Sequence, residues 1–240
     1  MVINSGEEGL GNLKGVRKIM ENFKVRELVS FDSNAASMTV RAVGSKRYRV
    51  AIDTEGGHSY GAFGNRNAIA YLAALINDLY QIKVPPVGKT TYNVGTIEGG
   101  TSVNTIAQHA EMLYEFRSDE REALEIMERH FSAAIEFYRT KGIEVTVTLV
   151  GDRPCNGEPD EAKHQALIAR AAAAVKKHYG YEVVLKSGST DCNIPLSMGV
   201  PAVCPGCIMG KGAHTREEYV NIDSLEPGIR LVKELIFSHF

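Results

Sequence analysis

The sequence predicts an α/β protein in which an α+β domain is inserted into another domain. Two observations support this. Between residues 45 and 150, strand-type and helix-type hydrophobic patterns follow one another in the order β-α-β-β-α-β. On either side of that stretch, short strands alternate with helices, so residues 1–44 and 151–240 are expected to share one mixed sheet with flanking helices.

The N-terminal stretch places two adjacent carboxylates, Glu7 and Glu8, between glycines and directly before a helical pattern. Apolar residues there recur at three- and four-residue steps, as on one face of a helix: Leu10, Leu13, Val16, Ile19, Met20 and Phe23. Negative charge is favoured at a helix start, so a capping role would explain the pair. Alternatively, one carboxylate binds a cation while its neighbour holds a water against it.

A short strand containing Val29 and Phe31 is expected next, and Asp32 stands where it ends. In open α/β sheets, acidic residues at strand ends often face the ligand crevice, although Asp32 could equally be a turn residue. Residues 37–44 are predicted to form the strand that leads into the inserted domain.

The inserted domain, residues 45–150, is predicted to be a ferredoxin-like, four-stranded antiparallel sheet with two helices on one face. Strands are expected at residues 47–52, 91–97, 109–117 and 143–149, and helices at residues 67–80 and 120–138. The second helix should point five residues inward: Leu124, Met127, Phe131, Ile135 and Tyr138. A Gly-Gly turn carries His58, which taken alone is explained as a turn residue.

Gly151 is expected to return the chain to the first domain. Elements are then predicted in this order: a helix at residues 163–179, a strand at 181–185, a polar loop at 187–191, a short helix at 192–198, a strand at 200–204, a glycine-rich loop at 206–212 and a closing helix at 225–237. Asp191 is a candidate cap for the short helix, and His214 follows the glycine-rich loop.

Charge and cysteine content narrow the possible partners and compartment. With 27 basic and 29 acidic residues, the chain has no electrostatic footprint for nucleic acid or an anionic membrane surface. No apolar run approaches the length of a membrane span. Four cysteines in 240 residues fit reduced thiols in a cytoplasm. Cys204 and Cys207 form a single C-x-x-C motif. A redox role for this motif is one interpretation, but the sequence favours two small side chains near the end of a strand.

Several polar stretches combine into a recognisable set. They are Ser5–Gly11, Asp32, Gly56–Ser59, Asn65–Ile69, Gly95–Gly100 with Asn104, Arg117–Ser118, Gly188–Asp191, and His214 with Glu218–Val220. In this order, over nearly the whole chain, they resemble the zinc-dependent exopeptidase and amidohydrolase family that includes peptidase T, G-type glutamate carboxypeptidase, acetylornithine deacetylase and aminoacylase. Each motif is weak alone, and the set is specific.

The resemblance implies a catalytic domain at residues 1–44 and 151–240. Glu7 matches the general base that takes a proton from a metal-bound water, and Glu8, Asp32 and His214 match ligands of a pair of zinc ions. Carboxylate oxygens and imidazole nitrogens are ordinary zinc ligands. Two metals that share a hydroxide would lower the pKa of the water and polarise an amide.

The resemblance also implies that residues 45–150 form a lid and dimerisation domain. His58 matches the histidine that one subunit of a homodimer offers to the oxyanion in its partner's site. Asn104 and Arg117 match residues that hold the carboxylate of the substrate or polarise its carbonyl, and an arginine fork suits a carboxylate. The implied substrates are peptides or N-acyl amino acids.

The family pattern also has an N-terminal His-x-Asp ligand and an aspartate that bridges both metals, and this sequence contains neither. The sequence is therefore expected to be a fragment that lacks the first strands of the catalytic sheet. It should bind zinc weakly or not at all, and it should expose a hydrophobic sheet edge or face that invites association. The alternative is a non-catalytic, dimerising remnant.

Overall fold

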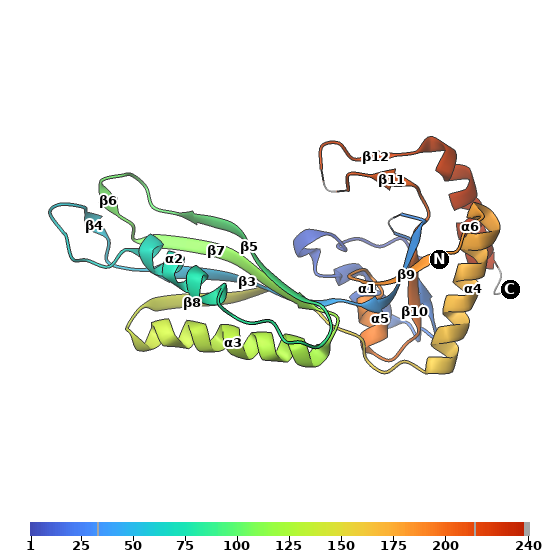
Figure 1. The fold of residues 1–240 in the computed structure, drawn as a ribbon, viewed down its shortest axis with the longest axis horizontal. Coiled ribbons are helices and arrows are strands. Elements are labelled where there is room, and N and C mark those ends of the chain that lie inside the picture. Colours follow the sequence, from blue (N-terminus) through green and yellow to red (C-terminus); the bar gives the residue numbers. More distant parts are fainter. Residues whose placement is uncertain (33, 214, 238–240) are drawn as a thin grey trace. The chain divides into compact units, whose positions relative to one another are not determined.

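The computed structural model describes residues 1–32, 34–213 and 215–237. The chain divides into two compact units. Unit 1 contains residues 1–44 and 153–240, and unit 2 contains residues 45–152. Figure 1 shows the elements of both. No helix among the described residues is long and apolar enough to cross a membrane.

Unit 2 is built on a four-stranded sheet in the order β5-β7-β3-β8. In chain order its main elements are β3 (Gly44–Asp53), α2 (Ala68–Leu79), β5 (Thr90–Gly99), β7 (His109–Ser118), α3 (Arg121–Thr140) and β8 (Glu144–Arg153). The helices α2 and α3 contact each other, and both pack against β7. The predicted β-α-β-β-α-β order is therefore confirmed.

The core of unit 2 is aromatic because alternate residues of β7 point toward the helices. Tyr114 and Phe116 are buried there, and Phe131 of α3 stacks on Tyr114 with 5.6 Å between ring centroids. All five residues that the sequence predicts to face inward from α3 are buried. The sequence spaces Ile69, Leu72, Ile76 and Leu79 as one helical face of α2, but Ile69 is exposed, and Leu75, which is outside that set, is fully buried.

Unit 1 is built on a mixed four-stranded sheet in the order β1-β10-β2-β9. The strands are β1 (Leu28–Val29), β2 (Ser37–Ala42), β9 (Val184–Gly188) and β10 (Ala202–Pro205). β1 runs parallel to β10 and β2 runs parallel to β9, whereas β10 and β2 are antiparallel. This is the mixed sheet that the sequence predicts.

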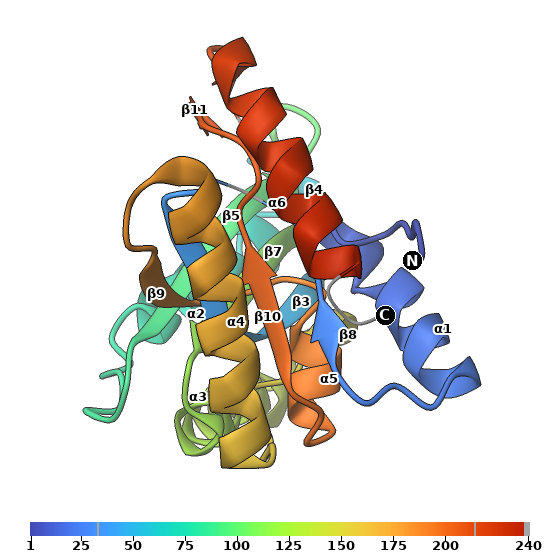
Figure 2. The same ribbon diagram turned by 90° about the vertical axis from the view of Figure 1, so that its right-hand side faces the viewer.

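Helices cover both faces of this sheet. On β10, Val203 packs into a cluster with Leu167 of α4 (Glu161–Tyr179) and Leu231 of α6 (Leu225–Phe237). The neighbouring residues on β10, Ala202 and Cys204, point to the opposite face. They pack there beside α5 (Asn193–Ser197), and α5 in turn contacts α1 (Lys14–Asn22). Figure 2 shows α4 and α6 lying along β10.

Several local expectations in unit 1 need correction. The first helix starts at Lys14 after a single 3₁₀ turn, so Leu10 is exposed although it shares the helical pattern. Phe31 lies beyond the end of β1. Asp191 does not cap α5, because its carboxylate instead accepts a hydrogen bond from the Asn4 side chain at 2.9 Å. Two short strands, β11 (Gly210–Lys211) and β12 (Tyr219–Val220), pair within the loop before α6.

Candidate functional site

The loop that carries Glu7 and Glu8 is tightly folded on itself. The amide of Leu13 donates to the carbonyl of Gly6 at 2.9 Å, and the amide of Gly11 donates to the carbonyl of Glu8 at 2.9 Å. A side chain at Gly11 would meet the Gly6 carbonyl at 2.5 Å. Leu13 has φ +60°, a conformation unusual for a residue with a side chain, and is fully buried in unit 1. Backbone strain of this kind is typical of functional loops.

Five acidic residues line one hollow of unit 1, which has a volume of about 680 Å³, and one of them, Glu27, is paired with Arg170. Glu7 and Glu8 come from the N-terminal loop, Asp32 follows β1, and Asp191 follows β9. The structure therefore brings together three predicted site residues and one that the sequence suggested only as a helix cap. The remaining walls are mostly apolar and come chiefly from residues 1–3, α1, β1 and α6.

A buried arginine compensates this acidic cluster. The side chain of Arg153 is only 5% exposed, and its Nη1 donates to Oε1 of Glu7 at 3.0 Å. The same nitrogen donates to Oγ of Ser189 at 3.1 Å, and Nη2 donates to the backbone carbonyl of Glu7. Arg153 thus joins the N-terminal loop to the loop after β9. No local sequence pattern indicates Arg153 as a site residue, because 146 positions separate it from Glu7.

Burial is the main cause that raises the pKa of Glu7 above its ordinary value. Arg153 opposes the shift, and the nearby carboxylates of Glu8 and Asp32 add to it. The pKa of Asp191 is also raised, chiefly by burial, while Asn4 and Arg153 lower it. A carboxyl group with a raised pKa exchanges protons closer to neutral pH, which suits a general base.

This shift predicts how the stability of unit 1 varies with pH. The folded state takes up the Glu7 proton more readily than the unfolded chain does. The stabilisation from Glu7 is therefore complete below pH 4.5, the ordinary value, and is lost as pH rises through the higher folded-state pKa. We expect the difference in unfolding free energy between wild type and Glu7→Gln to shrink between pH 4.5 and 7 in urea titrations. A difference that grows with pH would contradict this assignment.

His58 and Asn104 lie close together in unit 2. β4 (Gly57–His58) pairs with β6 (Thr105–Ile106), and the Ser59 amide donates to the carbonyl of Asn104 at 2.9 Å. The amides of Tyr60 and Gly61 both donate to Nδ1 of His58 at 3.3 Å. Since Nδ1 accepts these bonds, the neutral ring carries its proton on Nε2 and can donate it from an exposed position.

Arg117 does not lie close to His58 and Asn104 within unit 2. It pairs with Thr91 near the end of β7, whereas His58 and Asn104 lie beside the start of that strand. At about 3.3 Å per residue, the eight steps from His109 to Arg117 span roughly 26 Å. Within unit 2, the predicted substrate-binding pair Asn104 and Arg117 is therefore separated.

The described residues do not form a metal centre by themselves. His214 lies outside them, and within residues 1–32, 34–213 and 215–237 no three His, Cys, Asp or Glu side chains group so that they could hold a metal ion. Glu7, a predicted base, is engaged by Arg153. The donor set of the described residues thus does not fit a zinc ion.

The C-x-x-C shows no sign of redox chemistry. Cys204 is buried in β10, and contact with Cys192 together with burial raises the pKa of its thiol. Burial also raises the pKa of the Cys207 thiol. Reactive cysteines need a lowered pKa and access to solvent, so the structure favours two packed, free thiols.

Comparison with known proteins places unit 2 within a described domain family. Residues 40–139 match the model of the M20 family's peptidase dimerisation domain. This match covers His58, Asn104 and Arg117.

Two relatives match the chain over nearly its whole length. YqjE of Bacillus subtilis, an uncharacterised protein, is 25% identical over 246 residues, which cover 98% of this chain and 63% of that protein. A putative succinyl-diaminopimelate desuccinylase, DapE, of Mycobacterium tuberculosis is 22% identical, and the match covers 98% of this chain and 64% of that protein. The chain thus spans slightly less than two thirds of the length of these curated relatives.

Solved structures share the fold over the same extent. A tripeptidase of Staphylococcus aureus superposes with a TM-score of 0.74 at 24% identity, covering 98% of this chain and 62% of that one. The aminopeptidase PepT of Bacillus cereus gives a TM-score of 0.70 at 23% identity, covering 96% and 61%. The family match thus identifies residues 40–139 as a domain of the M20 peptidase dimerisation type, and the likeness to these solved structures shows that the chain shares their fold.

Proposed function

We propose that this chain acts in the hydrolysis of an amide or peptide bond, with its site in the acidic hollow of unit 1. The observation that carries the proposal is the convergence of Glu7, Glu8, Asp32 and Asp191 on one hollow. Peptides and N-acyl amino acids are the proposed substrates. They agree with the names of the similar proteins, a tripeptidase, an aminopeptidase and a putative desuccinylase.

The roles proposed for individual residues follow from this placement. Glu7 is the proton acceptor, since its carboxylate is half-buried and its pKa is raised. Glu8, Asp32 and His214 are the zinc ligands that this chain contributes. Because the described donors alone do not fit a metal ion, a pair of zinc ions would also need donors from polypeptide outside residues 1–240.

Residues of unit 2 are proposed to act on the substrate. His58 can donate from Nε2 to a developing oxyanion, because backbone amides hold its other ring nitrogen as an acceptor. Asn104 lies beside it, and Arg117 supplies a guanidinium for a carboxylate. Arg117 would reach a different part of the substrate from His58, given their separation along β7.

Metal analysis together with an activity panel tests the proposal. The 240-residue chain alone is expected to hold zinc weakly or not at all, and to show no detectable hydrolysis of dipeptides, tripeptides or N-acyl amino acids. Co-expression with a segment that supplies the His-x-Asp ligand and the bridging aspartate should restore both. Glu7→Gln in the restored protein should keep the zinc and lose the activity. Two tightly bound zinc ions with turnover by the chain alone would refute the ligand assignment.

A homodimer through unit 2 is the proposed assembly, supported by the dimerisation-domain match. His58 is exposed within its own unit, so a partner's site is a suitable place for it to act. Sedimentation velocity at micromolar concentration should show a dimer for wild type and for His58→Ala. A wild-type monomer would remove the reason given for the role of His58.

The alternative is a dimerising protein without catalytic activity. This alternative is favoured by the ion pair between Arg153 and Glu7, because Arg153 engages the carboxylate that is proposed as the base. The activity of the restored protein distinguishes the two proposals, because a non-catalytic protein would stay inactive in the presence of zinc and the added segment. The free cysteines agree with a reducing compartment, and a cytoplasmic location is proposed on that ground.

A further inference from the structure

Unit 1 has a second charged hollow, and cations outnumber carboxylates in it. This hollow has a volume of about 710 Å³ and lies where the chain enters β1 and β10. The charged residues that line it are three cations, Arg26, Lys163 and Arg170, and two carboxylates, Glu27 and Asp160. We refer to this cavity as the basic hollow.

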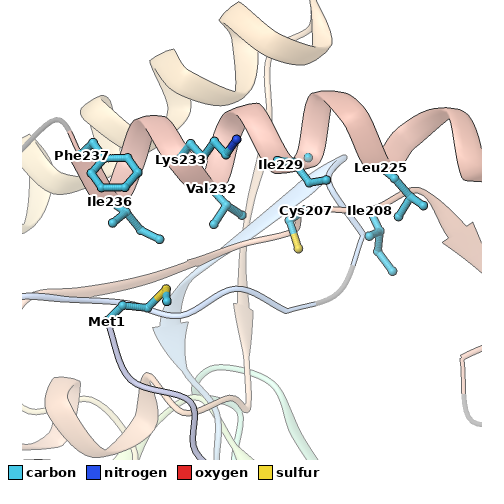
Figure 3. A pocket seen from close by; sticks show the side chains of 10 residues that line it. Met1, Cys207, Ile208, Leu225, Ile229, Val232, Lys233, Ile236 and Phe237 are labelled. Atoms are coloured by element: carbon cyan, nitrogen blue, oxygen red, sulfur yellow. The ribbon is translucent and has the colours of Figure 1, made fainter.

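A hollow along α6 in the same unit has a different chemical character. It has a volume of about 610 Å³, and Figure 3 shows the apolar side chains of α6 above Met1 and Cys207. Lys233 is the charged side chain among its lining residues. Opposite charges thus converge in the basic hollow but not along α6, so the basic hollow is the one suited to select a charged ligand.

Regular elements of unit 1 present the cations of the basic hollow. Lys163, Ala166 and Arg170 follow one another at steps of three and four residues, so they share one face of α4. Arg26 stands just before β1, whose first amide, that of Leu28, donates to the carbonyl of Pro201 at 3.0 Å. A helix and a paired strand therefore fix the backbone at these positions.

Arg170 has donors to spare for a ligand. Its Nη2 donates to Oε1 of Glu27 at 2.6 Å, and each of the two side chains is 33% exposed. Its Nε is buried without a hydrogen-bond partner among the described residues. A guanidinium carries five N–H donors, so Arg170 can hold a further acceptor while Glu27 stays paired.

Arg26 is the cation that lacks a counter-charge. Within residues 1–32, 34–213 and 215–237, its exposed side chain makes no hydrogen bond or ion pair. Lys163 is paired with Asp160 at 2.9 Å, but these side chains are 74% and 47% exposed, and such surface pairs are weak. Three cations against two carboxylates leave the basic hollow with a net charge of +1.

We propose that the basic hollow binds a small organic carboxylate. Arg26 and Arg170 hold the carboxylate, because guanidinium forks match its planar pair of oxygens. Ala166, Val200 and Pro201 offer an apolar wall for the body of the ligand. One negative charge cancels the net charge of the hollow, whereas a dianion would add repulsion from the two carboxylates already there. This binding involves neither zinc nor Glu7, so it is independent of the proposed hydrolysis.

Titration calorimetry on the 240-residue chain tests the proposal without metal or catalysis. The probe is isovalerate, a small branched carboxylate, and the matched control ligand is isoamyl alcohol, which has the same branched body without the charge. We expect isovalerate to bind with a Kd of about 1 mM or lower, and the alcohol not to bind detectably. The affinity for isovalerate should fall as salt is added, because the attracting charges lie near the surface.

Four substitutions assign the binding to the basic hollow. Arg26→Ala and Arg170→Gln should each weaken isovalerate binding by about tenfold or more. Glu27→Gln should instead tighten it by about threefold, since it removes an acceptor that competes for Arg170. A residue that only stabilises the fold would not produce this opposite sign. Arg230→Ala is the control, because Arg230 is 65% exposed on α6, pairs with Glu226 and does not line the basic hollow.

Each of four outcomes would overturn the proposal. Isovalerate that binds no more tightly than the alcohol would show that the carboxylate is not recognised. Wild-type affinity in Arg26→Ala and Arg170→Gln, with the fold confirmed by far-UV circular dichroism, would place the binding elsewhere. Weaker binding in Glu27→Gln would contradict the charge assignment. Inorganic phosphate that binds about tenfold tighter than isovalerate would show that the ligand class is wrong.

Discussion

Phe131→Ala is expected to destabilise unit 2 by about 3–5 kcal/mol, the usual cost of removing a fully packed aromatic side chain. Phe131 is 3% exposed. Its ring stacks on Tyr48 with 4.5 Å between centroids and on Tyr114 with 5.6 Å, and it also contacts Phe116. Alanine would leave a cavity against these three rings, which lie on the neighbouring strands β3 and β7 of the sheet.

The same helix provides a matched control. Phe137 is also on α3 but is 49% exposed, and Lys141 lies over its ring at 3.9 Å. Phe137→Ala should cost less than about 1 kcal/mol. Urea denaturation followed by far-UV circular dichroism measures both variants. Equal losses for Phe131→Ala and Phe137→Ala would show that the aromatic cluster is not the core of unit 2.

Elements with a strong period were predictable from the sequence. The alternation in β7 and the three- and four-residue spacing in α3 each select one face, and that face is buried in the structure. Where apolar residues are abundant, the period is ambiguous. In α2 both Ile69 and Leu75 are apolar, and only packing against β7 and α3 decides that Leu75 is the buried one.

The site was predictable only as separate motifs. Glu7, Glu8 and Asp32 could be found because each stands at a loop beside a recognisable element. The partners of those residues could not, since they come from distant parts of the chain. The local sequence predicts Asp191 as a helix cap, yet its carboxylate accepts a hydrogen bond from Asn4, 187 positions away. A single sequence contains no signal for such a pairing.

Arg153→Met is expected to destabilise unit 1 by about 3 kcal/mol, because it leaves the half-buried Glu7 carboxylate without its cation. It also removes the bond to Ser189 and the contact with the Glu7 carbonyl, so the N-terminal loop loses its link to the loop after β9. Arg153→Lys keeps the charge and should lose less. Arg170→Met serves as control, since Arg170 and its partner Glu27 are each 33% exposed.

The pH dependence of the stability loss in Arg153→Met distinguishes loss of this ion pair from loss of packing. The Arg153 guanidinium lowers the pKa of Glu7 and of Asp191, so both pKa values should rise further in Arg153→Met. Both carboxyls would then take up protons at higher pH, and the loss of stability should be larger at pH 7 than at pH 5. Urea titrations at the two pH values, repeated in a Glu7→Gln background, measure the coupling. If the loss is the same at both pH values and in both backgrounds, the ion pair does not stabilise the loop, and Arg153 contributes only by filling space.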